Sequence, residues 1–219
     1  MAIQTIQFGD EGQLATRELL RQFDAAVATQ PARYAALRKQ LATLEALDRQ
    51  YGGLAPLVLE DVDQLVGAIH HDAAQFEDPD LTIGVALWAI RHQVALLFPE
   101  SVVNALAQRS NRAASKQELA AVFGLMQGVI AHVGPQLSAD LERSNPERPW
   151  RVLHANLAIT AIRTEDPVLI DFAFDALDAA LPGERAGFYA EALALALAPG
   201  VAPLVRERIE TRHSRCNQL

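Results

Sequence analysis

Two groups of polar side chains interrupt helical segments that are otherwise apolar. Arg91 and His92 fall inside one apolar stretch, while Asn156, Thr160 and Arg163 share a stripe of a later helix. Buried polar groups need hydrogen-bond partners, so these residues face water, satisfy one another in the core, or line a pocket. A metal- or small-molecule-dependent enzyme that joins His92 with Asn156 or Arg163 is therefore one hypothesis for this chain.

Three aspartates form a second pattern. Asp171, Asp175 and Asp178 follow an i, i+4, i+7 spacing, which places them on one stripe of an almost wholly apolar helix. Like charges stacked in this way cost some helix stability. The stripe is therefore either the solvated edge of a buried helix or an acidic surface that docks a basic partner.

The pair His71-Asp72 resembles the signature of the HD-domain phosphohydrolases, in which both residues hold a metal. The resemblance implies a metal-dependent hydrolase, and it covers these two residues. The family's upstream histidine ligand has no counterpart, because no histidine precedes His70. His70 and His71 point to different faces of one helix and cannot chelate jointly. We therefore expect an exposed helix face here, with no metal and no cofactor.

Residues 116–133 are similar in spacing to the helix-turn-helix family, with Ala120, then Gly124 four positions later, then Ile130. In that family the small residue lets two helices approach and the glycine turns the chain, which implies a DNA-binding regulator. A single amphipathic helix that contains a glycine gives much the same pattern. The net charge of −8 makes nucleic acid an unlikely partner, so one continuous core helix is the preferred interpretation.

Prolines just inside helix starts and glycines at helix ends divide the chain clearly. No segment shows strand-like alternation, and alanine and leucine favour helix, so the sequence predicts an all-α fold of roughly ten helices. The expected helices cover residues 12–29, 31–51, 62–76, 79–98, 100–108, 115–133, 136–143, 150–163, 167–181, 184–198 and 203–213.

Short Asp-Pro and Pro-Gly turns between these helices predict stacked antiparallel hairpins, either as an irregular α-solenoid-like array or as a multi-helix bundle. We expect one domain over residues 1–219, with a possible subdomain boundary at the polar loop 144–149. The nearly all-apolar helical segment 186–198 is expected to lie centrally in the core or to form half of a homodimer contact.

Several sequence features indicate where in the cell the protein is expected to be. Residues 1–7 have neither a basic region nor an apolar core, so no secretory signal is expected. Segment 81–98 carries Arg91 and His92, and segment 186–198 is too short to cross a bilayer. Cys216 is the sole cysteine, which excludes an internal disulfide framework. We expect a cytoplasmic protein that does not enter membranes.

The sequence has no nucleophile elbow, phosphate loop, dinucleotide fingerprint, CxxC pair or HExxH motif. The preferred hypothesis is therefore a protein-interaction or scaffold module that acts through an acidic surface, with a protein partner or self-association. The alternatives are an enzyme that uses the polar residues inside its helices, and a DNA-binding regulator.

Overall fold

The computed structural model describes residues 35–50, 79–91, 99–137 and 148–216, together with the single residues Ala32, Ala68 and Leu96. These residues are predominantly helical and contain no strand, which confirms the all-α prediction for this part of the chain. The expected helices at 12–29 and 62–76, and most of 136–143, lie outside it, so fewer than ten helices are described. They are α2 (Ala35–Gln50), α4 (Pro79–Arg91), α5 (Pro99–Arg112), α6 (Lys116–Leu137), α7 (Pro149–Thr164), α8 (Pro167–Ala180), α9 (Arg185–Ala196) and α10 (Pro203–Cys216).

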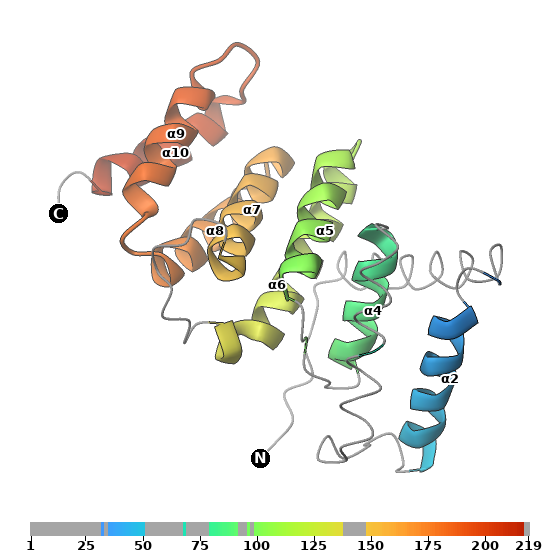
Figure 1. Ribbon diagram of the computed structural model, residues 1–219. Coiled ribbons are helices and arrows are strands. Elements are labelled where there is room, and N and C mark those ends of the chain that lie inside the picture. Colours follow the sequence, from blue (N-terminus) through green and yellow to red (C-terminus); the bar gives the residue numbers. More distant parts are fainter. Residues whose placement is uncertain are drawn as a thin grey trace.

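The helices follow one another across the molecule in chain order, from α2 at one end to α9 and α10 at the other (Figure 1). Short connections make antiparallel hairpins of α5 with α6, α7 with α8, and α9 with α10. Neighbouring hairpins stack through α5 and α6 on α7 and through α8 on α10. One buried apolar cluster runs from Ile83 in α4 to Ile209 in α10. The boundary expected at 144–149 falls largely outside the described residues and stays a prediction.

Local side-chain chemistry sets the helix starts where the sequence predicts them. The Ser115 hydroxyl accepts a hydrogen bond from the Glu118 amide at 3.1 Å, which caps α6. The Asp166 carboxylate accepts from the amides of Val168 and Leu169 at 2.8 and 3.3 Å and caps α8. Glu165, between α7 and α8, adopts a left-handed conformation with φ of 57°, which reverses the chain within two residues.

Three predicted helix ends are wrong. Helix α5 does not end near Gln108 but continues to Arg112. Helix α6 does not stop before Gly134 but continues through Pro135 to Leu137, as one helix without a turn at Gly124. Pro135 removes only one hydrogen bond near the helix end, and the Trp150 ring packs over Gly134, 3.6 Å from where a Cβ would lie. The helix expected over 79–98 is not continuous either, because Leu96 is not helical. The continuous α6 leaves no helix-turn-helix at 116–133.

Helix α9 is not central in the core, although its composition allowed that expectation. Only Tyr189 and Ala196 are buried along it, whereas Leu195 is 75% exposed. An apolar helix must be covered to gain from the hydrophobic effect, and here the described chain covers one side of it. This incomplete burial creates the candidate site described below.

Candidate functional site

The predicted acidic stripe on α8 faces α10, where two arginines form ion pairs with its three carboxylates. The Asp171 carboxylate pairs with Arg208 at 2.9 Å. Asp175 and Asp178 both bind the Arg212 guanidinium, at 2.6 and 2.9 Å. Because all three carboxylates have a cation within the fold, the stripe is the seam that fixes α10 on α8.

The Arg212 side chain is 15% exposed, whereas the Arg208 side chain is 40% exposed. We therefore expect Arg212→Met to lower the free energy of unfolding by about 2 kcal/mol, because it leaves the partly buried Asp178 without its cation. The matched variant Arg208→Met breaks an exposed pair and should cost about 0.5 kcal/mol. Urea unfolding followed by circular dichroism measures both. Equal losses would contradict this ranking.

The stripe of polar residues on α7 splits into two environments. Asn156 donates to the backbone carbonyl of Val152 in its own helix at 2.9 Å. Thr160 is buried, and its hydroxyl lies 2.8 Å from the hydroxyl of Ser110 on α5. The Arg163 guanidinium donates to the Ser110 carbonyl at 2.9 Å and to its hydroxyl at 3.2 Å. Thr160 and Arg163 thus tie α7 to the end of α5, and Asn156 does not join them.

The remaining sequence candidates cannot be placed with these residues. His92 and the pair His71-Asp72 lie outside the described residues, and only the backbone of Arg91 is described, at the end of α4. Over the described ranges, no three His, Cys, Asp or Glu side chains gather in a way that could hold a metal ion. In the same ranges, no helix combines the length and the hydropathy that a bilayer crossing requires.

His154 is a buried residue of α7 that the sequence did not single out. Its ring packs edge-on against Trp150, with 4.3 Å between the ring centroids. Among the described residues neither ring nitrogen has a hydrogen-bond partner, and burial lowers the pKa of His154 to about 4. The imidazole is therefore neutral at physiological pH. It packs in the core like an apolar side chain, although its two nitrogens could each form a hydrogen bond.

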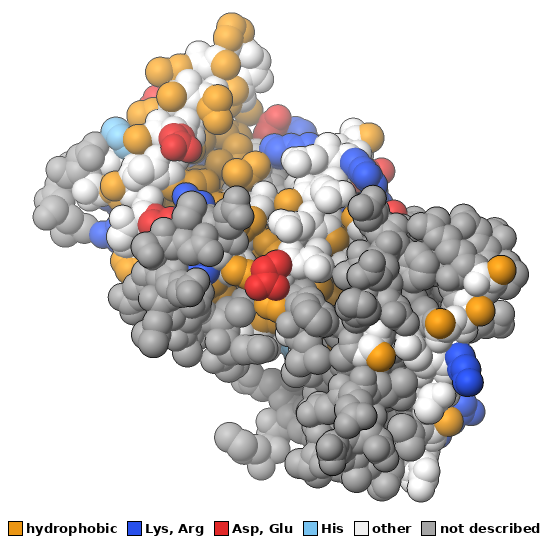
Figure 2. Space-filling model, in the orientation of Figure 1, with side chains coloured by type: hydrophobic (Ala, Val, Ile, Leu, Met, Phe, Trp, Pro, Cys, Tyr) orange, Lys and Arg blue, Asp and Glu red, His pale blue; other side chains and the backbone are white. Residues whose placement is uncertain are grey.

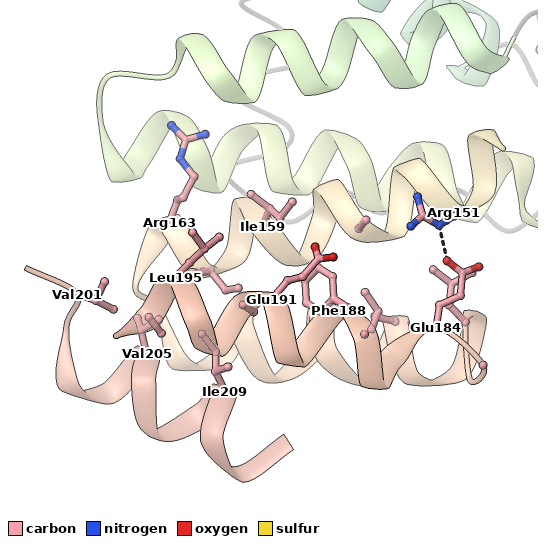
Figure 3. Close-up of a pocket in the computed structure, with 18 residues that line it drawn as sticks. Arg151, Ile159, Arg163, Glu184, Phe188, Glu191, Leu195, Val201, Val205 and Ile209 are labelled. Atoms are coloured by element: carbon pink, nitrogen blue, oxygen red, sulfur yellow. Dashed lines mark hydrogen bonds and ion pairs between the residues drawn. The ribbon is translucent and has the colours of Figure 1, made fainter. Parts of the chain in front are cut away.

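A groove of about 670 Å³ lies between α7 and α9, with α8 and α10 beneath it (Figure 3). It exists because α10 packs on α8 and α9 packs on α10, while α9 stands away from α7. Its lining is mainly aliphatic and aromatic, and includes Ile159, Ile162, Phe188, Leu195, Val205 and Ile209. Hydrophobic side chains also gather over this end of the molecule on the face shown in Figure 2.

Four charged side chains line the groove. Arg151 at one end donates to the carboxylate of Glu184, which also lies 3.7 Å from Arg148. Arg163 at the other end contributes its stem, while its guanidinium is directed away from α9 (Figure 3). Glu191 stands on the α9 wall, and its carboxylate points across the groove toward α7 (Figure 3).

Sequence reasoning identified Arg163 but missed the other groove residues. Leu195 and Ile159 are 75% and 43% exposed, although the spacing of apolar residues in their helices predicts that both side chains are buried in the core. The sequence feature that indicates a groove is the set of small residues on α9, such as Gly187 and Ala192. Their short side chains leave space between α9 and α7. No family model, curated protein or solved structure matches the chain.

Proposed function

We propose that this chain is a protein-interaction module and that the α7/α9 groove receives an apolar segment of its partner. The observation that supports the proposal is the open groove, in which Leu195 is left 75% exposed beside Ile159 and Phe188. Concave apolar surfaces with a polar rim are typical of sites that bind a partner. Stacked helical hairpins commonly provide such surfaces between neighbouring units.

The groove supports this function better than the acidic stripe does. Asp171, Asp175 and Asp178 already bind Arg208 and Arg212, so a basic partner would have to displace these arginines. Leu195 requires no such exchange, because covering it releases water alone. Burying a leucine side chain fully contributes about 1.5–3 kcal/mol. The groove therefore offers the larger gain to a docking segment.

The test is a pair of matched variants. Leu195 lines the groove, whereas Leu197 is 64% exposed, lies two residues further along and is not part of the lining. We would select helical peptides of about 16 residues, roughly four turns, from a displayed amphipathic library on the wild-type protein and measure their Kd. Leu195→Glu should raise the Kd by at least about tenfold, and Leu197→Glu by less than about twofold.

Circular dichroism and unfolding midpoints of both variants should equal those of the wild type, because each leucine is exposed in the fold. If no selected peptide depends on Leu195, or if both substitutions weaken binding equally, the groove is not the docking site. The selection does not assume a partner sequence, so it also reveals which side chains the groove accepts.

A further inference from the structure

Glu191 is the one lining charge that nothing in the described chain engages. It is exposed on α9, one helical turn before Leu195, and makes no hydrogen bond or ion pair with any residue that the structure describes. Its carboxylate reaches over the apolar floor toward α7 (Figure 3). A segment that fills the groove would therefore remove water from this carboxylate, which costs free energy unless the segment supplies a cation.

The other three charged side chains that line the groove already have hydrogen-bond partners within the fold, so an occupant need not supply one. Arg151 and Glu184 are bonded to each other at one end. Arg163 donates to Ser110 and directs its guanidinium away from α9 (Figure 3). The occupant thus meets an apolar surface on which Glu191 is the one carboxylate without a partner among the described residues, in a protein whose formal net charge is −8.

We infer that the groove takes a basic amphipathic helix, whose apolar face packs on Ile159 and Leu195 and whose lysine or arginine pairs with Glu191. This inference rests on the proposed function and names the chemistry of the partner. Complementary charge steers encounter and selects among partners, while the apolar face supplies most of the affinity. The net charge of −8 favours a cationic partner over a second copy of this acidic chain, and Glu191 disfavours an apolar carboxylic acid.

A helix fits the length of the site. The α7 residues that line the groove extend from Arg151 to Arg163, and α9 lines it from Gly187 to Ala196. At about 1.5 Å per residue, the α7 wall offers room for between three and four turns of a docked helix and the α9 wall for about three. Such a helix presents apolar anchors at i, i+3 or i+4, and i+7 to one groove, and its flanking positions reach the rim.

The experiment exchanges the charge on the groove wall. The displayed amphipathic library is selected in parallel on the wild type, on Glu191→Lys and on Glu207→Lys, in which an exposed α10 glutamate outside the groove lining is changed. Both variants change the net charge equally, so Glu207→Lys controls for general steering. We expect lysine and arginine beside the apolar anchors with the wild type and Glu207→Lys, and aspartate and glutamate with Glu191→Lys.

Individual peptides give the quantitative test. A peptide selected on the wild type should bind Glu191→Gln about two- to fivefold more weakly, as for a partly exposed ion pair, and added salt should reduce that difference. Unchanged peptide composition on Glu191→Lys, together with Leu195-dependent binding, overturns the inference and leaves the proposed function intact. Loss of every Leu195-dependent binder overturns the proposed function itself.

Two further outcomes would also overturn the inference. A concentration-dependent dimer in sedimentation that Leu195→Glu abolishes would identify a second copy of the chain as the occupant. A lipid retained in native mass spectrometry of the wild type and absent from Leu195→Glu would identify a small apolar ligand.

Discussion

Replacing Tyr189 with alanine should lower the free energy of unfolding by about 4 kcal/mol, the largest effect we expect from any single substitution in α9. Tyr189 is fully buried, and it is the one large buried side chain of that helix. Its ring makes T-shaped contacts with Phe174 and Phe188, with 5.1 and 5.5 Å between centroids. The substitution removes these contacts and leaves a cavity between α8 and α9.

The control is Tyr189→Phe, which keeps the ring and removes the hydroxyl. That hydroxyl donates to the Asp178 carboxylate at 3.0 Å and lies 3.4 Å from the Phe174 carbonyl, so its loss should cost about 1 kcal/mol. Urea unfolding gives both values, and hydrogen exchange should show the α9 amides losing protection first in Tyr189→Ala. A loss below about 2 kcal/mol in Tyr189→Ala would mean that other contacts hold α9 in place.

Acidification should destabilise the fold through His154. Its pKa is lowered from 6.5 to about 4 by burial, so between these values the unfolded chain binds a proton that the folded chain does not. Stability is therefore complete above pH 6.5 and falls as the pH drops toward 4. The difference in pKa corresponds to a loss of about 3 kcal/mol at the acid end.

The substitution His154→Leu isolates this effect from the carboxylates, which also titrate at low pH. The two ring nitrogens have no hydrogen-bond partner in the part of the chain that the structure describes, so the variant's stability at pH 7 should lie within about 1.5 kcal/mol of the wild type. Guanidinium unfolding at several pH values between 7 and 4 gives the difference between the two proteins. A difference that does not change with pH would show that His154 keeps its ordinary pKa.

Helix identity and helix starts could be predicted from the sequence because they depend on local chemistry. Asp166 caps α8 with its own side chain and Pro167 occupies the first turn, and both interactions lie within three residues. The end of α6 could not be predicted in this way. Whether the chain turns at Gly134 depends on the packing of Trp150, sixteen positions later and in another helix.

The candidate site was less predictable because it depends on which helix faces which. The spacing of Asp171, Asp175 and Asp178 shows that they share a face, but not that α10 lies opposite. The signal was present in Arg208 and Arg212, whose i, i+4 spacing matches the stripe. The distance between α7 and α9 has no comparable signature, since it follows from the stacking of whole hairpins.

The turn between α7 and α8 has a consequence for how the groove can adapt to an occupant. The left-handed Glu165 and the capping carboxylate of Asp166 lock these two helices into one unit. Helix α9 has no capping hydrogen bond at its start, where the Glu184 side chain binds Arg151 of α7 instead. One wall and part of the floor therefore move as one unit, and α9 is joined to α7 at its Glu184 end. Occupants of different girth should displace the Leu195 end of α9 and leave α7 in place.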